Sequence, residues 1–278
     1  MKIDLQNASA RHPAARTSAA SALKALSLQI RAGEQVAVIG PSGAGKTTLL
    51  QLLACALPPT EGAVVLDGVS PWQLSRKALQ LLRGRLFLAP QVPPLPPRQR
   101  VVTAVLAGRL PAMSLMASVR SLFYPTDIPA AHHALEKFDL SEKLFERVDR
   151  LSGGERQRVG LARSLVAPAT LWLIDEPLSA LDPTRANQAM VTLVAGARER
   201  GVTLVATLHQ VDMALAHFSR IVGLRDGELA FDLPAEQVTQ ALLSRLYDRY
   251  EHELRGEAAT VSLDIAPAPP QPAVMHCR

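Results

Sequence analysis

Residues 40–50 have the composition and spacing of a phosphate-binding loop. They read GPSGAGKTTLL, after an apolar run typical of a strand and before a run typical of a helix. Glycines in this context let the backbone N–H groups of residues 41–47 converge on a β-phosphate at a helix N-terminus, where the dipole favours anions. We expect Lys46 to bridge the β- and γ-phosphates and the Thr47 hydroxyl to bind Mg²⁺. The predicted nucleotide-binding residues are Gly40, Pro41, Ser42, Gly43, Ala44, Gly45, Lys46, Thr47 and Thr48.

A second stretch, TLWLIDEP at residues 170–177, supplies two carboxylates. Its apolar run is typical of a buried strand and ends in Asp175, which we expect to reach Mg²⁺ beside the phosphates. Glu176 follows at once, where it can orient or deprotonate a water that attacks the γ-phosphate. An isolated Asp-Glu pair is more often a solvated turn, but this pair accompanies a phosphate-binding loop. The two stretches together predict a site that hydrolyses a nucleoside triphosphate with Mg²⁺ as cofactor.

Residues 151–165, LSGGERQRVGLARSL, have the pattern of half a phosphate site. Ser152, Gly153 and Gly154 offer a hydroxyl and several N–H donors at the start of a predicted helix. The stretch has no lysine and no neighbouring metal-binding carboxylate. Such a half site becomes complete when it closes over a nucleotide held by another chain, and the simplest supplier is a second copy packed head to tail. Two copies would then form two complete sites.

Strand-like runs alternate with helix-length segments along the chain. This alternation predicts βαβ units around a largely parallel sheet. Asp226-Gly227, between two alternating runs, predicts an antiparallel hairpin over residues 220–233, so the sheet is expected to be mixed. Helices are expected at residues 46–57 and 184–200. The other predicted strands span residues 24–30, 34–40, 62–68, 85–90, 170–175 and 202–209.

Residues 99–150 show helical patterns and are entered through the proline-rich APQVPPLPPR at 89–98. Prolines at this density exclude a helix or a sheet ladder, which predicts an extended connection to a small helical subdomain. The Ala- and Pro-rich residues from 255 to the end at 278 predict a disordered tail.

The composition indicates a globular protein without a basic run. The net charge is +5 and the pI about 9.6, but Arg and Lys are scattered among acids, so we expect no nucleic-acid partner. No apolar run approaches the roughly 20 residues that span a bilayer, and the N-terminus lacks the apolar core of a secretory signal. Cys55 and Cys277 predict no disulfide framework. These features favour a cytoplasmic protein.

The combination of GPSGAGKTT, LSGGERQR, LWLIDEP and LSALD resembles the ATP-binding subunits of ATP-binding-cassette (ABC) transporters. The resemblance covers approximately residues 1–250 as one ATP-binding domain. It implies an α/β fold: a P-loop NTPase core with a mostly parallel sheet and an antiparallel β part, interrupted by a helical subdomain at about 92–163. Residues 251–278 remain as the tail.

The resemblance also implies roles for the half site and for four residues outside it. Gln91 takes the place of a glutamine that senses Mg²⁺ and water and hinges the helical subdomain. Ser152, Gly153 and Gly154 would face the γ-phosphate of the opposite subunit. Asp182 would lie at the dimer seam, and His209 would contact the γ-phosphate. His12 takes the place of an aromatic residue, often Tyr, that stacks on adenine, and we expect looser adenine binding with the smaller imidazole.

A finer resemblance is carried by LAGRL, RSLFYPTD, HQVDMA and RIVGLRDGELAFD, which are similar to the ATP-binding subunits of phosphonate importers. It implies separate transmembrane permease subunits, an indirect partnership with a solute-binding protein, and a peripheral location at the cytoplasmic face of the inner membrane. Phosphonates or related phosphorus oxyanions are the implied solutes, although the solute never touches this chain.

Three alternatives remain open at this point. They are an importer subunit for another solute, a cassette ATPase in DNA repair or chromosome organisation, and a nucleotide-binding regulator without turnover. The single cassette and the lack of sustained heptads disfavour the second, and Glu176 disfavours the third.

Overall fold

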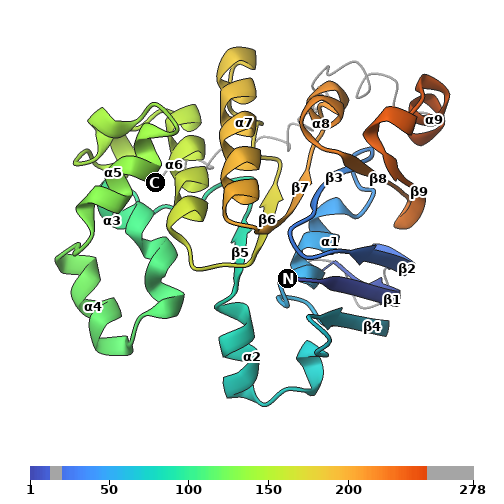
Figure 1. The fold of residues 1–278 in the computed structure, drawn as a ribbon, viewed down its shortest axis with the longest axis horizontal. Coiled ribbons are helices and arrows are strands. Elements are labelled where there is room, and N and C mark those ends of the chain that lie inside the picture. The colour runs from blue at the N-terminus through green and yellow to red at the C-terminus, as the bar shows by residue number, and fades with distance from the viewer. Residues whose placement is uncertain (13–20, 249–278) are drawn as a thin grey trace, which may run out of the picture.

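A six-stranded sheet forms the centre of the molecule (Figure 1). The computed structural model describes residues 1–12 and 21–248, so the expected tail and Cys277 lie outside the described residues. The strand order is β5-β6-β7-β3-β8-β9, and neighbouring strands are parallel except for the antiparallel pair β8 and β9. The mixed sheet and the hairpin at Asp226-Gly227 are thus confirmed. The bounds are β3 Gln35–Ile39, β5 Leu86–Ala89, β6 Leu171–Asp175, β7 Thr203–Thr207, β8 Arg220–Arg225 and β9 Glu228–Pro234.

A separate antiparallel sheet has the order β2-β1-β4. Its strands are β1 Ile3–Ala10, β2 Leu23–Ile30 and β4 Glu61–Leu66. The strand β1 was not predicted from the sequence. Its pairing register shifts after Leu5, and Asn7 has a φ of +47°, so a bulge interrupts the alternation of apolar and polar residues on which strand prediction depends.

Alternate residues of β3 face two different hydrophobic cores. Val36 and Val38 pack with α1 (Lys46–Leu53) and the antiparallel sheet, whereas Ala37 and Ile39 pack with α7 (Pro183–Glu199) and α8 (Val211–His217). All five residues of β3 are buried, as a parallel strand covered on both faces requires. The carboxyl end of β3 is therefore held rigidly where the phosphate-binding loop begins.

Two of the expected helices differ slightly in length from the prediction. The helix expected at 46–57 ends at Leu53 because Cys55 has a φ of +54°, which no right-handed helix accommodates. Burial raises the pKa of the Cys55 thiol to about 11. The helix expected at 184–200 is α7. Two further helices of the core are α2 (Arg76–Arg83) and α9 (Gln240–Leu246).

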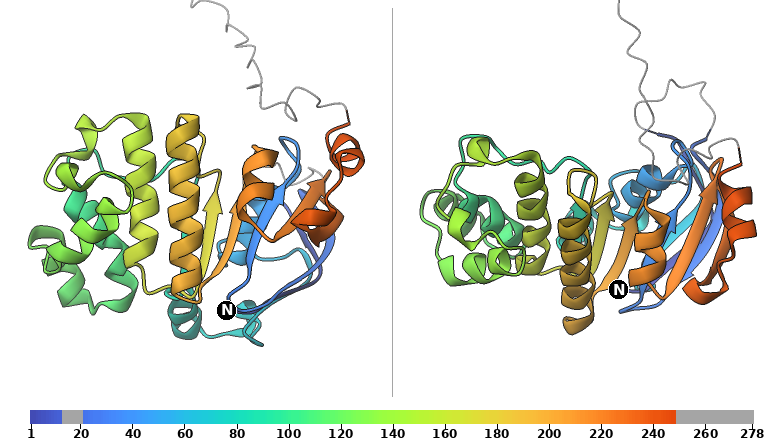
Figure 2. Two further views of the ribbon diagram at one scale, coloured as in Figure 1. Left: turned by 45° about the horizontal axis from the view of Figure 1, so that its top comes forward. Right: turned by 90° about the horizontal axis from the view of Figure 1, so that it is seen from above.

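Four helices form a lobe at the end of the molecule away from β9 and α9 (Figure 2). They are α3 (Val101–Leu106), α4 (Leu115–Phe123), α5 (Ile128–Glu136) and α6 (Gly153–Val166), and we call them the helical lobe. The helical subdomain of the predicted fold class is thereby confirmed, while its bounds at 92–163 stay a prediction.

The proline-rich residues 90–97 join β5 to the helical lobe without helix or strand, as expected. The ring of Pro93 packs against α6, because a Cβ added at Gly160 would lie 2.7 Å from Pro93 Cγ. No helix within residues 1–12 and 21–248 is long and apolar enough to cross a membrane.

Candidate active site

The loop between β3 and α1 depends on two glycines that lie against neighbouring backbone. Gly40 has a φ of +151° and Gly45 a φ of +100°, conformations that side-chain-bearing residues rarely adopt. A Cβ at Gly40 would lie 2.1 Å from the carbonyl oxygen of Leu224, and one at Gly45 would lie 2.5 Å from that of Ala22. The loop can therefore approach β8 and the start of β2 this closely only with glycine at both positions.

Lys46 brings a positive charge to the same place as the N-terminus of α1. Its side chain is buried, and Nζ donates to the carbonyl oxygens of Gly40 at 2.6 Å and Pro41 at 3.2 Å. Among residues 1–12 and 21–248, no side chain caps the N-terminus of α1 at Gly45. Because the first N–H groups of a helix have no intrahelical partner and the dipole is positive there, this terminus suits an anion such as phosphate.

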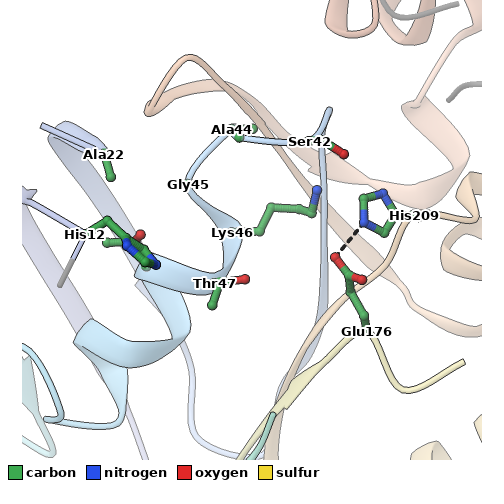
Figure 3. A pocket seen from close by; sticks show the side chains of 11 residues that line it. His12, Ala22, Ser42, Ala44, Gly45, Lys46, Thr47, Glu176 and His209 are labelled. Atoms are coloured by element: carbon green, nitrogen blue, oxygen red, sulfur yellow. Dashed lines mark ion pairs between the residues drawn. The ribbon is translucent and has the colours of Figure 1, made fainter. Parts of the chain in front are cut away.

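A cavity of about 370 Å³ opens beside this loop (Figure 3). It is lined by residues 42–48 together with His12, Ala22, Glu176 and His209. His12 lies at one end, whereas the side chain of Lys46 points toward Glu176 and His209 at the other. The cavity thus joins the residue predicted to stack on adenine to those predicted to meet the γ-phosphate.

Glu176 is held at both carboxylate oxygens. His209 Nε2 lies 2.5 Å from Oε1, and Gln91 Nε2 donates to Oε2 at 2.6 Å. Burial raises the pKa of the Glu176 carboxyl, but the hydrogen bond from His209 and the charges of His209 and Lys46 outweigh it, so this pKa lies below its ordinary value. The residue also has a φ of +46°, a strained backbone conformation of the kind found at functional sites.

Asp175 and Glu176 share a support, Thr207, that the sequence did not predict. The Thr207 hydroxyl donates to Asp175 Oδ1 at 2.6 Å and accepts the N–H of Glu176 at 3.0 Å. A threonine near the end of the mostly apolar run VTLVATLH was the available signal. Because Thr207 ends β7 and Asp175 ends the adjacent β6, the two side chains meet at one edge of the sheet.

The residues near Asp175 fit a magnesium ion bound mainly by substrate and water. The Asp175 carboxylate is buried, and it takes part in none of the ion pairs found among residues 1–12 and 21–248. The same ranges contain no group of three His, Cys, Asp or Glu residues that would form a protein cage. Mg²⁺ usually takes one or two carboxylates and completes its shell with phosphates and water, so Thr47, Asp175 and Gln91 remain its predicted ligands.

The predicted half site lies apart from the cavity. Ser152 is the N-cap of α6: its hydroxyl accepts the N–H of Glu155 at 3.2 Å, and its own N–H donates to the Glu155 carboxylate at 2.7 Å. Ser152 and Gly153 are exposed, and none of residues 152–154 lines the cavity. A Cβ at Gly154 would lie 2.9 Å from the carbonyl oxygen of Ala180, which places this helix start beside the loop that ends at Asp182.

The comparisons with known proteins agree with this geometry. Residues 23–179 match the ABC transporter family. A phosphonates import ATP-binding protein (PhnC 2) of Albidiferax ferrireducens is 67% identical over 278 residues, all of both chains, and one (PhnC) of a Polaromonas species is 66% identical over the same span. A solved dimeric ATP-binding cassette in a post-hydrolysis state, bound to ADP and phosphate, has a TM-score of 0.71 at 29% identity, covering 84% of this chain and 98% of that one.

Proposed function

The chain belongs to the ABC transporter family, and from this premise we propose that it hydrolyses ATP to drive the import of phosphonates or related phosphorus oxyanions through separate membrane subunits. One observation carries the ATPase part: a single cavity brings together Lys46, Glu176 and His209. The full-length identity to importer subunits from two organisms supports the solute class.

Different residues along the cavity bind different parts of the nucleotide. The loop at 40–45 and the N-terminus of α1 bind the β-phosphate, and Lys46 bridges the β- and γ-phosphates. His12 stacks on adenine at the far end. Imidazole offers less stacking area than a tyrosine ring, which lowers the share of affinity that comes from the base. Thr47, Asp175 and Gln91 hold Mg²⁺, which neutralises charge on the phosphates when bound.

Glu176 orients the attacking water. A carboxylate whose pKa lies below its ordinary value is ionised at neutral pH, but it is a weak base. As long as His209 is paired with the Glu176 carboxylate, orientation of the water is therefore the main contribution of Glu176. When His209 turns to the γ-phosphate, Glu176 loses this partner, its pKa rises and it becomes a stronger base.

A second copy completes the site through the exposed start of its α6. Ser152, Gly153 and Gly154 of that copy meet the γ-phosphate, with Asp182 at the seam between the two chains. Two observations support this arrangement: the helix start is exposed, and the related cassette of known structure is a dimer.

The decisive experiment for this reaction uses Glu176→Gln with Glu61→Gln, an exposed control. We expect the first variant to bind ATP, to release phosphate at least about 10²-fold more slowly, and to elute as a dimer from a sizing column in ATP but not in ADP. The control should turn over like the parent protein. Undiminished phosphate release by Glu176→Gln, or a monomer in saturating ATP, would contradict the proposal.

The helical lobe offers a surface for the permease. Leu115, Met116, Val119 and Phe123 of α4 are between 51% and 85% exposed. A cavity of about 440 Å³ adjoins them, between α2 and α4. Contiguous exposed apolar side chains mark interaction sites, and we assign this one to a cytoplasmic segment of the permease, which keeps the chain at the cytoplasmic face of the inner membrane.

The solute class is tested in cells that carry Glu176→Gln in place of the parent gene. Growth on a phosphonate as the sole phosphorus source should be lost, and growth on inorganic phosphate should be retained. If growth on phosphonates were unaffected and another solute were no longer taken up, the solute assignment would be wrong while the ATPase assignment stood.

A further inference from the structure

The segment that follows α9 reaches the phosphate-binding loop through one side chain, Tyr247. The ring is 1% exposed, which makes it one of the most deeply buried large side chains. Its hydroxyl accepts the backbone N–H of Gly40 at 3.2 Å, across 207 positions of sequence. None of the nucleotide-binding roles assigned above involves this residue.

Both polar backbone groups of Gly40 are engaged. Its N–H donates to Tyr247, and its carbonyl oxygen accepts from Lys46 Nζ at 2.6 Å. The close approach of Gly40 to the carbonyl oxygen of Leu224 fixes this backbone against β8. A buried N–H without an acceptor is costly, so the Tyr247 hydroxyl stabilises one orientation of the loop where it leaves β3.

The same region fixes the position of Tyr247 itself. Leu243 and Leu246 of α9 are buried in the core, and the guanidinium of Arg225 lies 3.6 Å from the Asp248 carboxylate and donates to the carbonyl oxygen of Arg245. Arg225 ends β8, the strand against which Gly40 packs. The end of β8, the α9 segment and the start of the loop therefore form one connected unit.

We propose that Tyr247 is a positioning residue for ATP binding, an inference that rests on the proposed function. By holding the N–H of Gly40, it keeps the Gly40 and Pro41 carbonyl oxygens turned toward Lys46 and so determines where the ammonium group lies. Affinity for the phosphates of ATP thus depends on the seating of α9, which lies at the edge of the molecule opposite the helical lobe.

The test compares Tyr247→Phe with Tyr124→Phe in the full chain. Tyr124 is 73% exposed and lies outside the cavity. Tyr124→Phe therefore removes the same hydroxyl group away from the site and is the matched control. For Tyr247→Phe we expect the KM for ATP to rise about two- to tenfold, the effect of one hydrogen bond, with kcat within about twofold. Tyr124→Phe should change neither constant. A raised KM with an unchanged kcat is the signature of binding that acts equally on the ground and transition states.

Two outcomes would overturn the inference. One is a lower melting temperature of Tyr247→Phe with an unchanged KM, which is what a purely structural role gives. The other is rapid exchange of the Gly40 amide hydrogen in the parent protein, measured by NMR, because the bond to Tyr247 requires protection. The exchange measurement still decides if the variant fails to fold. If the parent protein did not bind ATP, the proposed function would fail, and Gly40 protection would still report on Tyr247.

Discussion

The N-termini of α1 and α6 both carry the glycines and hydroxyls of a phosphate site, but their surroundings differ. At α1 the cap is Gly45, no side chain in the described part of the chain bonds to the helix start, and the first residue of the helix is the buried Lys46. At α6 the cap is Ser152, which exchanges two hydrogen bonds with Glu155 at an exposed position. The first terminus is completed by its own chain, whereas the second is self-capped and faces outward.

Under the proposed function, this difference explains why one chain would have two such termini. The start of α1 lies in a cavity of its own chain, so phosphate binding there does not depend on the presence of a second copy. A self-capped start remains stable without a ligand, because Ser152 and Glu155 exchange two hydrogen bonds. In the proposed dimer it would form the second half of the site, supplied by another copy when a nucleotide lies between the two chains.

The largest expected effect comes from Lys46→Ala at the first terminus. Removal of the ammonium group should slow ATP hydrolysis about 10²- to 10³-fold, because a preorganised charge at the phosphates is lost. ATP affinity should fall as well, and both are measured by phosphate release and by titration with ATP. Lys77→Ala, at an exposed position of α2, is the control. Unchanged ATP affinity would show that Lys46 does not make the N-terminus of α1 the phosphate-binding one.

A matched pair of glycine substitutions sharpens the comparison. Gly45→Ala places a Cβ 2.5 Å from a backbone oxygen at a φ of +100°, so we expect a loss of about 1–3 kcal/mol in the free energy of unfolding and weaker ATP binding. Gly153→Ala meets nothing within 4 Å and should change stability by less than about 0.5 kcal/mol. Urea unfolding of both variants is the measurement. Equal losses would mean that the second terminus is as tightly packed as the first.

Ser152→Ala should have a smaller effect on stability. Loss of the N-cap hydroxyl lowers the free energy of unfolding by about 1 kcal/mol, seen as a shift in the urea midpoint. Affinity of the single chain for ATP should stay within about twofold, because Ser152 lies outside the cavity. Turnover at high protein concentration should nevertheless fall, since the second copy no longer offers its hydroxyl. A large loss of ATP affinity in the monomer would place Ser152 in its own chain's site.

The smallest effect concerns Glu155→Gln and its dependence on pH. The N–H of Ser152 donates to the Glu155 carboxylate, and this is the main reason why the pKa of Glu155 lies below its ordinary value. A depressed pKa in the folded state gives stability above the ordinary pKa of Glu, and that stability is lost as the pH falls through the folded-state value. At pH 7 the free energy of unfolding of the parent protein should exceed that of Glu155→Gln by about 0.3–1 kcal/mol.

Denaturant unfolding at pH 7 and at about pH 3.5, below the ordinary pKa of Glu, checks this prediction. The difference between parent and Glu155→Gln should shrink at the lower pH. A difference that stays constant between the two pH values would show that the charge of Glu155 does not contribute to the cap.

The fold class and much of the cavity could be predicted from the sequence, because their signals are local. The loop at 40–48 and the carboxylates of Asp175 and Glu176 each occupy one short continuous stretch that follows a strand. His209 and Gln91 needed the family resemblance, and the structure joins both to Glu176. Their roles in catalysis remain predictions.

The parts that were not predicted depend on contacts between distant segments. Thr207 meets Asp175 across 32 positions, and Tyr247 meets Gly40 across 207. No periodicity within either segment indicates these pairs. The strand β1 was missed for a local reason, since the bulge near Asn7 removes the alternation that marks a strand.

The proline-rich connection has a mechanical consequence. Five prolines stand between Ala89 and Arg98, and each locks its φ angle, so the connection bends less than an ordinary loop of its length. One end carries Gln91, which touches Glu176, and Pro93 rests against α6. We therefore expect a rotation of the helical lobe to be transmitted through this stiff connection and to shift the amide of Gln91 relative to the Glu176 carboxylate.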